Sequence, residues 1–209
     1  MKTLALLAIV ITAGYASAFA QTEKKPEFFA GYSFETVDTG IKSTDFTATT
    51  TSLDNRFHLN GLNLSAAGYF TKRLGVTGDF SAHFANRADS FDTSTGNSKV
   101  SLYNITGGPQ LRFPSTGKLT PFVHVLAGIA RRNLTETFTS GTGNFTDSKT
   151  GFAMNLGGGV DYQLNKRFAW RLVQFDYNPI FLRGRIINTV TFPDRTLKGF
   201  RFSTGIVIR

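Results

Sequence analysis

The chain has 209 residues, a formal net charge of +9 and no cysteine. This length suits a single domain, and the lack of cysteine excludes disulfide bonds and thiolate metal sites. The basic residues are scattered singly or in pairs and form no stripe, so the charge favours an anionic lipid surface over nucleic acid.

The first 20 residues have the pattern of a secretory signal peptide. Lys2 precedes a short apolar run, residues 4–13, and small residues follow in Ala16-Ser-Ala-Phe-Ala20. Cleavage fits after Ala18 or Ala20, and we favour Ala20. The alternative is an uncleaved anchor helix, but the run is shorter than the ~20 residues that a membrane span needs. The predicted domains are therefore a signal peptide, 1–20, and one folded domain, 21–209.

The mature chain repeats segments in which apolar and small or polar residues alternate, which is typical of strands with one apolar face. Eight such segments are predicted, at residues 28–37, 59–70, 74–84, 99–113, 120–133, 151–162, 168–181 and 197–209. Long polar stretches at 38–57, 85–98, 134–150 and 183–195 are predicted loops, and short turns lie between the other segments.

The seventh segment is ambiguous. Arg171 shares a face with Val173 and Phe175, whereas Asp176 shares the other face with Trp170. Either a β-bulge interrupts the alternation, or Arg171 and Trp170 lie at a membrane boundary.

The last segment alternates clearly and is expected to close a barrel. Its apolar face, which we expect to contact lipid, consists of Phe200, Phe202, Ile206 and Ile208. Arg201, Ser203 and Gly205 lie on the other face, and Thr204 is a polar exception on the apolar face.

These patterns predict an all-β protein, an eight-stranded antiparallel up-and-down transmembrane β-barrel. The last strand is expected to pair with the seventh and with the first. The alternative is a soluble eight-stranded barrel of the lipocalin kind. It fits less well, because small and charged residues suit a narrow lumen and the Gly-x-Trp signature is missing from the first strand.

Charged side chains on the inward face are expected to pair across the lumen, because unpaired buried charges are costly. The predicted polar network consists of Glu35, Asp79, Arg112, His124, Arg132, Asp161 and Arg201. A salt-bridged plug is the main interpretation, and a gated narrow ion path is the alternative.

Catalysis has one candidate group. Asp79, Ser81 and His83 share one strand face, and some eight-stranded barrels cleave or transfer the acyl chains of lipid A. That face points into the lumen and away from acyl chains, so we predict no enzyme activity. No metal-ligand spacing is seen, and no cofactor is predicted.

Four segments carry a family resemblance, at residues 27–33, 74–81, 155–162 and 200–206. With them the chain resembles the outer membrane protein A-like and opacity-type β-barrel domains. The resemblance implies a Gram-negative outer membrane, periplasmic turns and four extracellular loops. It also implies contact with outer-membrane lipids and lipopolysaccharide, assembly by periplasmic chaperones and the barrel-assembly machinery, and a monomer. Arg209 departs from the family, whose barrels end in an aromatic residue.

The expected role is structural or interactive, in adhesion or envelope integrity, and is exerted through the four loops. A narrow passive pore for small solutes or ions is one alternative function. A lipid A acyl hydrolase or transferase is the other.

Overall fold

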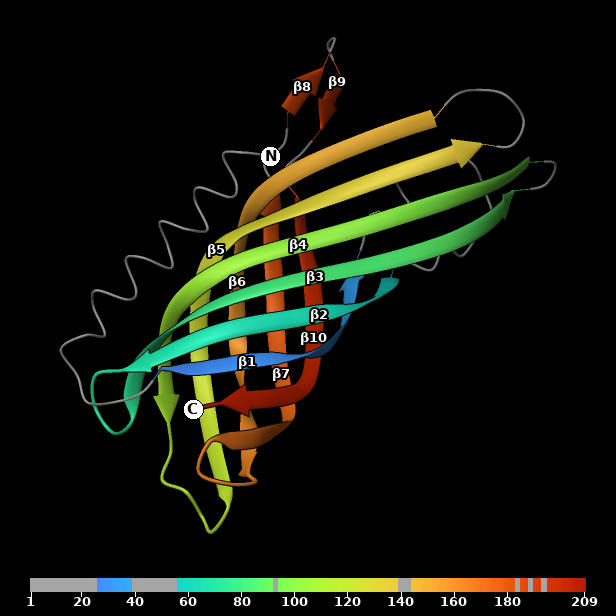
Figure 1. Cartoon of the computed structure of the whole chain (residues 1–209). Coiled ribbons are helices and arrows are strands. Elements are labelled where there is room, and N and C mark those ends of the chain that lie inside the picture. The colour runs from blue at the N-terminus through green and yellow to red at the C-terminus, as the bar shows by residue number, and fades with distance from the viewer. Residues whose placement is uncertain are drawn as a thin grey trace, which may run out of the picture.

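The computed structural model describes residues 26–38, 56–91, 94–138, 144–182, 185–187, 190–192 and 195–209. Eight strands form a closed antiparallel barrel (Figure 1). They are β1 (Glu27–Asp38), β2 (Arg56–Tyr69), β3 (Leu74–Phe91), β4 (Ser94–Arg112), β5 (Leu119–Phe138), β6 (Asn144–Gln163), β7 (Phe168–Leu182) and β10 (Arg195–Ile208). The predicted fold class is confirmed.

The first and last barrel strands close the sheet. β10 pairs with β1 from Phe28↔Ile208 to Val37↔Gly199, and with β7 on its other side. Closure gives the backbone groups of both strands partners, which a bilayer core requires because it offers no water. The expected pairing of the last strand is therefore confirmed.

No helix within the described residues is long and apolar enough to cross a membrane. The predicted signal peptide, residues 1–20, lies outside the described residues. Residues 39–55 of the first predicted loop also lie outside them. The division into a signal peptide and one domain stays a prediction.

Two predicted loops were wrong. β3 and β4 continue as strands to Phe91 and from Ser94, and β5 and β6 continue to Phe138 and from Asn144. Residues 85–98 and 134–150 are thus mostly strand. Their sequences are polar on both faces, so they lack the apolar alternation that marks a half-buried strand. Cross-strand neighbours such as Thr135↔Thr146 support the pairing instead.

A third predicted loop, residues 183–195, contains a small separate sheet. β8 (Arg185–Ile187) pairs with β9 (Val190–Phe192), and this hairpin is not part of the barrel. It stands beyond the end of the barrel in Figure 1. Below, "loop end" means the end of the barrel that carries these long connections, and "turn end" means the opposite end.

Side chains fix two of the tight turns at the turn end. The Thr71 hydroxyl accepts hydrogen bonds from the backbone N–H groups of Arg73 and Leu74, and Asn165 Oδ1 accepts from Arg167 and Phe168. In the third turn Gly117 has a φ of 63°, a conformation that glycine adopts without steric cost. The local sequence therefore specifies these turns.

A β-bulge in β7 explains the ambiguous seventh segment. Arg171 pairs with Gly205 and Gln174 pairs with Ser203, so two β7 residues, Leu172 and Val173, face only Thr204. The pairing with β6 skips Leu172 in the same way. The extra residue lets Arg171 point inward while Asp176, five positions on, also points inward.

Thr204 serves this bulge. Its hydroxyl donates a hydrogen bond to the Arg171 carbonyl oxygen, 2.9 Å away, and accepts one from Trp170 Nε1. A bulge leaves a backbone group without a ladder partner, and a hydroxyl on the opposite strand supplies one. Thr204, the polar residue between Phe202 and Ile206 on the apolar face, thereby has a structural role.

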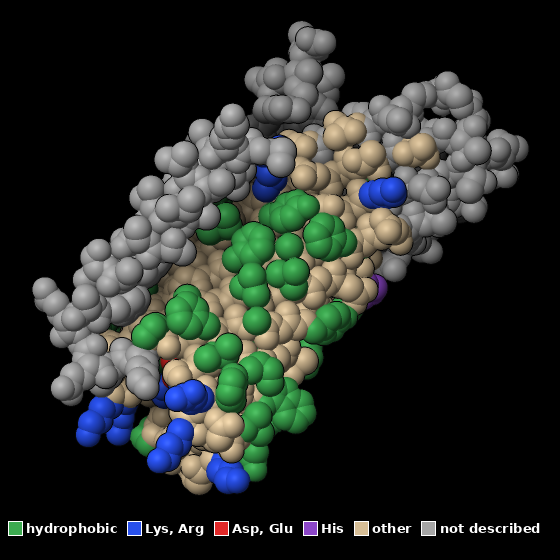
Figure 2. All heavy atoms as spheres, viewed as in Figure 1, with side chains coloured by type: hydrophobic (Ala, Val, Ile, Leu, Met, Phe, Trp, Pro, Cys, Tyr) green, Lys and Arg blue, Asp and Glu red, His purple; other side chains and the backbone are tan. Residues whose placement is uncertain are grey.

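The outer face of the barrel is apolar. Figure 2 shows hydrophobic side chains spread over the wall, with Lys and Arg side chains toward both ends. Phe200, Phe202, Ile206 and Ile208 are between 38% and 49% exposed, whereas Arg201 and Ser203 on the same strand are buried. This placement matches a lipid-facing strand, and contact with lipid itself stays a prediction.

We predict that deletion of Leu172 is tolerated. The deletion removes the bulge and restores regular pairing while Arg171 and Asp176 keep pointing inward. Deletion of Phe34 in β1 is the matched control, because β1 pairs without irregularity on both sides and the deletion turns the residues on one side of the gap to the wrong face. Electrophoresis of unboiled refolded protein should give a heat-modifiable band for the Leu172 deletion and none for the Phe34 deletion. Equal behaviour of the two would contradict the bulge assignment.

Candidate functional site

Polar side chains fill the middle of the barrel interior. Alternation along each strand sends every second residue inward, and barrels of eight strands have room for little more than their own side chains. The polar residues that are completely buried are Ser33, Glu35, Asn63, Ser81, His83, Asn104, Asn155, Asp176, Asn178, Arg201 and Ser203.

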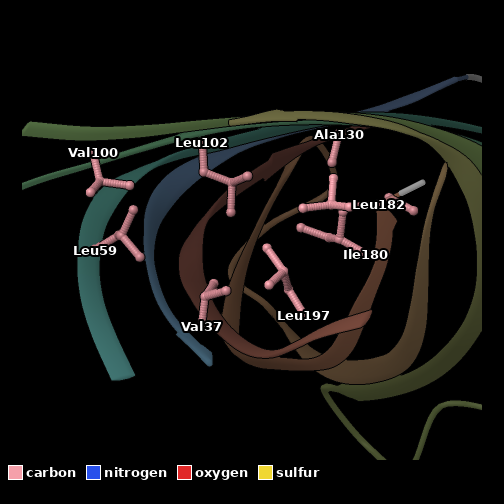
Figure 3. Packing of buried hydrophobic residues seen from close by; sticks show 9 residues of the cluster. Val37, Leu59, Val100, Leu102, Ala130, Ile180, Leu182 and Leu197 are labelled. Atoms are coloured by element: carbon pink, nitrogen blue, oxygen red, sulfur yellow. The ribbon is translucent and has the colours of Figure 1, made fainter. Parts of the chain in front are cut away.

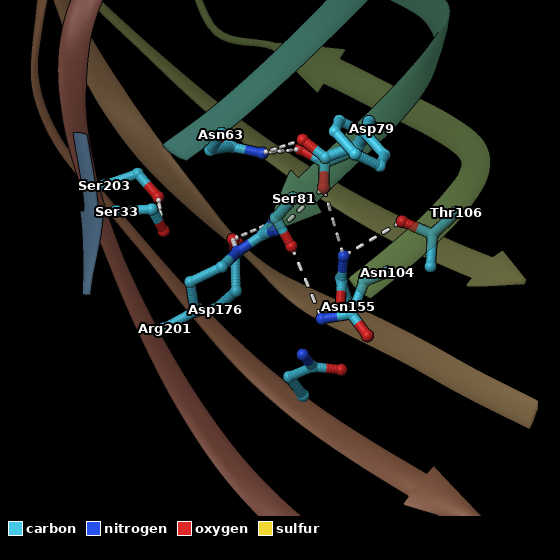
Figure 4. A network of polar contacts seen from close by, with 12 residues as sticks. Ser33, Asn63, Asp79, Ser81, Asn104, Thr106, Asn155, Asp176, Arg201 and Ser203 are labelled. Atoms are coloured by element: carbon cyan, nitrogen blue, oxygen red, sulfur yellow. Dashed lines mark hydrogen bonds and ion pairs between the residues drawn. The ribbon is translucent and has the colours of Figure 1, made fainter. Parts of the chain in front are cut away.

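Arg201 on β10 lies at the centre of this network (Figure 4). Its Nη1 donates to Asp79 Oδ1 at 2.7 Å, and its Nη2 and Nε donate to Asp176 Oδ2 at 2.7 and 3.0 Å. One guanidinium thus bridges carboxylates on β3 and β7. Its planar set of donors suits such a double contact better than a lysine ammonium would.

Both carboxylates receive further donors. Asn63 Nδ2 donates to Asp79 Oδ2 at 2.7 Å. Asp176 accepts from Gln174 Nε2 at 2.8 Å and lies 2.7 Å from His124 Nε2. Buried carboxylates remain ionised when such donors replace water, so the network holds charged groups without leaving them unpaired.

Gly157 makes room for Asp176. A Cβ atom at this position would collide with Asp176 Oδ1 and with the Phe175 carbonyl oxygen. The glycine-rich run of β6 therefore allows close packing in the lumen.

His83 joins a second polar group near β1. Its Nδ1 lies 2.9 Å from Glu35 Oε2 and its Nε2 lies 2.8 Å from Ser33 Oγ. Asn178 Nδ2 donates to the other Glu35 oxygen at 2.6 Å. The sequence candidate grouped His83 with Ser81 and Asp79 on its own strand, but its contacts come from β1.

Ser33, His83 and Glu35 have the contact order of a hydrolase triad. All three side chains are completely buried, so a substrate has no approach to Ser33. The neighbouring backbone N–H groups lie in paired strands, where the ladder uses them. This arrangement acts as a hydrogen-bonded brace between β1 and β3.

A chain of ion pairs crosses the turn end of the lumen, and we call it the floor. Glu27 pairs with Arg112 and with Arg209, whose Nε lies 2.6 Å from Glu27 Oε1. Arg209 also reaches Asp161, which pairs with Arg171 at 2.8 Å. These contacts link β1, β4, β6 and β7, so Arg209 ties the first strand to the opposite wall.

Aromatic rings hold Arg171 in this floor. Its guanidinium carbon lies 4.4 Å from the centre of the Phe29 ring and 4.2 Å from that of Phe122. Cation–π contact of this kind partly replaces hydration for a buried arginine.

The loop end of the lumen is apolar (Figure 3). Val37, Leu102 and Ile180 each lie two residues toward the loop end from the polar Glu35, Asn104 and Asn178. We call the whole cluster the apolar layer. Its members are Val37, Leu59, Val100, Leu102, Ala130, Ala153, Ile180, Leu182 and Leu197. The described interior thus carries the apolar layer toward the loop end, with Arg132 of β5 at the same level, and is polar below.

The seven residues predicted to line the lumen fall into four places. Asp79, His124 and Arg201 meet at the central network, and Glu35 lies in the His83 group. Asp161 and Arg112 belong to the floor. Arg132 lies on β5 opposite Lys149, at the level of the apolar layer.

Sequence reasoning missed several members of the network. Their signal was hidden because the bulge breaks the alternation of β7 or because the residue stands at a strand end. These residues are Glu27, Arg171, Gln174, Asp176, Asn178 and Arg209.

A closed antiparallel barrel with an apolar outer face and a polar, ion-paired interior defines a transmembrane β-barrel. Within this class, the chain belongs to the outer membrane protein β-barrel domain family, which it matches over residues 4–190. Membership supports an outer-membrane location.

Two solved structures illustrate the likeness. Ail, the attachment invasion locus protein of Yersinia pestis, aligns with 90% of this chain and 99% of its own, at 18% identity and a TM-score of 0.53. Neisserial surface protein A aligns with 88% of this chain and 96% of its own, at 14% identity and a TM-score of 0.51. At such identities the likeness shows the fold. Comparison with curated proteins gives no match.

We predict that Arg201→Met destabilises the barrel by about 3–5 kcal/mol, because it leaves two buried carboxylates without their cation. The matched control is the triple variant Arg201→Met, Asp79→Asn, Asp176→Asn, which removes the carboxylate charges as well and should recover most of the loss. Urea unfolding in lipid vesicles measures both. If Arg201→Met were as stable as the wild type, the central role of Arg201 in the polar network would be contradicted.

Proposed function

We propose that this protein is a non-enzymatic outer-membrane barrel that acts through its extracellular end, in surface interaction or envelope integrity. The observation that carries the proposal is a four-stranded sheet that extends from a filled and cross-braced barrel. Recognition residues commonly lie at the ends of such rigid scaffolds.

The extension follows from strand length. β3, β4, β5 and β6 have 18, 19, 20 and 20 residues, whereas β1, β2, β7 and β10 have 12 to 15. A tilted strand crosses a bilayer with about 9–11 residues. The longer strands therefore have roughly eight residues to spare, or about 25 Å at ~3.3 Å per residue. Figure 1 shows them leaving the barrel together.

The rigid interior supports this assignment. The central network joins β3, β7 and β10, and the floor joins β1, β4, β6 and β7. Cross-bracing of this kind leaves little freedom for gating, and it fixes the base from which the long strands extend.

The same interior argues against the pore alternative. An open path needs continuous water, and here buried polar groups are followed by the apolar layer. Apolar constrictions exclude water and block ions. The enzyme alternative has weaker support still, because the triad-like group found among the described residues, Ser33, His83 and Glu35, is completely buried.

The location and the assembly route that we propose are those that the family implies. We propose that residues 1–20 direct export and that the barrel is assembled as a monomer by periplasmic chaperones and the barrel-assembly machinery. The basic net charge of the chain suits contact with the phosphates of lipopolysaccharide.

In planar lipid bilayers we expect no steady conductance from the wild type. The double variant Asp79→Asn, Arg201→Gln should conduct no better, because the apolar layer stays in place. Leu59→Ser combined with Leu102→Ser is the comparison that removes part of that layer. Stepwise wild-type currents that the double charge variant alters would favour the pore instead.

Removal of the strand extensions should abolish surface interaction while the barrel is kept. In this variant short turns replace residues 87–98 and 135–148. Bacteria that display the wild type should adhere to cultured epithelial cells or resist detergent better than cells without it, and the shortened variant should lose this gain. Heat-modifiable migration confirms its folding. A shortened variant with full activity, or a wild type with none, would contradict the proposal.

A further inference from the structure

Two turns at the turn end share one five-residue pattern. Phe70-Thr-Lys-Arg-Leu74 connects β2 to β3, and Leu164-Asn-Lys-Arg-Phe168 connects β6 to β7. Their backbone hydrogen bonds also match. The N–H groups of the first two residues donate to the carbonyl oxygen of the fifth, at 3.0 and 3.2 Å in the first turn and at 3.1 Å for both in the second. The same local structure, with Lys-Arg at its tip, therefore occurs twice.

The turn geometry does not require the Lys-Arg pair. The side chain before the pair, Thr71 or Asn165, accepts the hydrogen bonds that fix each turn. At the tip itself, turns favour Gly, Asn, Asp or Ser for their conformational freedom or local hydrogen bonds. All four basic side chains of the two tips are exposed. Their chemistry is thus available for a partner outside the chain.

The third turn adds one more cation. Lys118 is exposed in the connection between β4 and β5, and its Nζ lies 5.8 Å from the centre of the Tyr162 ring on β6. Its carbonyl oxygen accepts a hydrogen bond from the Gln163 N–H at 2.8 Å, so this turn lies beside the β6–β7 turn. We call the five exposed cations of the three turns the basic rim. They are Lys72, Arg73, Lys118, Lys166 and Arg167.

No acidic residue of the turns neutralises the basic rim. Residues 70–74, 113–118 and 164–168 contain neither Asp nor Glu. The carboxylates of Glu27 and Asp161 at this end are buried, and they pair with the arginines of the floor. The described surface of the turn end is therefore positive, and its complement is an anionic surface.

Large apolar side chains stand directly beside these cations. Phe70, Leu74, Leu164 and Phe168 flank the two Lys-Arg pairs and are between 41% and 52% exposed. A bilayer boundary suits both kinds of side chain, because acyl chains cover the apolar groups while the long stems of Lys and Arg reach the phosphates. Carboxylates of a peptide or of the cell wall would attract the cations but would leave the apolar side chains uncovered.

The two Lys-Arg turns also lie on opposite sides of the barrel. In the closed order β1-β10-β7-β6-β5-β4-β3-β2, the β2–β3 and β6–β7 connections are separated by the same number of strands in either direction. A compact ligand on the outer wall contacts one of them. The bilayer surrounds the barrel and contacts both.

We propose that the basic rim binds the headgroups of anionic glycerophospholipids in the leaflet at the turn end. Short turns of such barrels face the periplasm, so this leaflet is the periplasmic one. Each Lys or Arg near an anionic membrane surface adds to the attraction, and contacts on opposite sides hold the depth and tilt of the barrel. The inference concerns the end away from the projecting strands and does not depend on the proposed surface function.

The single tryptophan of the chain is a probe of lipid at this end. Trp170 is exposed on the outer face of β7, opposite Tyr162 and two residues from Phe168. Bromine atoms on acyl chains quench tryptophan fluorescence on contact. The barrel is reconstituted in phosphatidylcholine vesicles that contain equal small fractions of brominated phosphatidylglycerol or brominated phosphatidylcholine.

At low salt we expect quenching that corresponds to at least about threefold enrichment of phosphatidylglycerol at Trp170. Salt at about 1 M should remove most of this preference, because the Debye length then falls to ~3 Å. Equal quenching by the two lipids, or a preference that salt does not change, would overturn the proposal.

Two triple variants with the same loss of charge locate the site. The first removes the cations on the Trp170 side of the basic rim and should lose the preference: Lys118→Gln, Lys166→Gln and Arg167→Gln. The second removes exposed cations toward the loop end and should keep it: Lys99→Gln, Arg131→Gln and Lys198→Gln. Heat-modifiable migration checks the folding of both. Equal loss in the two variants, or loss in neither, would overturn the assignment to the basic rim.

The opposite turn is tested by moving the probe. Trp170→Phe combined with Phe70→Trp places the fluorophore beside Lys72 and Arg73, and the preference for phosphatidylglycerol should persist there. In this background Lys72→Gln with Arg73→Gln should abolish it. An absent preference at position 70 would overturn the two-sided contact.

Binding to the cell wall would give a different result. If the wild type cosediments with purified peptidoglycan and the first triple variant does not, while the two brominated lipids quench equally, the basic rim binds cell-wall carboxylates and the lipid proposal is wrong. Adhesion and detergent resistance of displaying bacteria test the projecting strands separately, so either proposal can fail alone.

Discussion

The interior of this barrel depends on the contact of Arg201 with Asp79 and Asp176. Removing three charges from water costs several kcal/mol for each ion, and the cost is offset only when geometry and hydrogen bonding are good. Amide and imidazole groups from neighbouring strands complete the carboxylate coordination. Strands far apart in the sequence are thereby held at fixed positions across the lumen.

A filled lumen leaves the interior to support the strands that extend from the barrel, and these strands carry the function that we propose. The floor of ion pairs, the central network and the apolar layer succeed one another along the interior, so the described residues form a solid support. Four strands that exceed the span of a bilayer use this support.

One extra residue in β7 determines which of its side chains point into the lumen. Without the bulge at Leu172, regular alternation would send either Arg171 or Asp176 toward lipid, where a charge is costly. The bulge turns both inward, and Thr204 supplies the hydrogen bond that the Arg171 carbonyl needs. The central network and the floor therefore both rely on a local departure from ideal pairing.

Alternation with a period of two is visible in the sequence, and it predicted the number of barrel strands, their closure and the inward facing of Glu35, Asp79 and Arg201. The contact partners of these side chains depend on how the sheet closes. His83 meets Ser33 and Glu35, and Arg201 meets Asp176, because closure brings together residues that no spacing relates. The tertiary structure also decided that residues 85–91 and 144–151 are strands. Their two faces are mostly polar, so the alternation that marks a half-buried strand is missing and pairing with a neighbouring strand defines them.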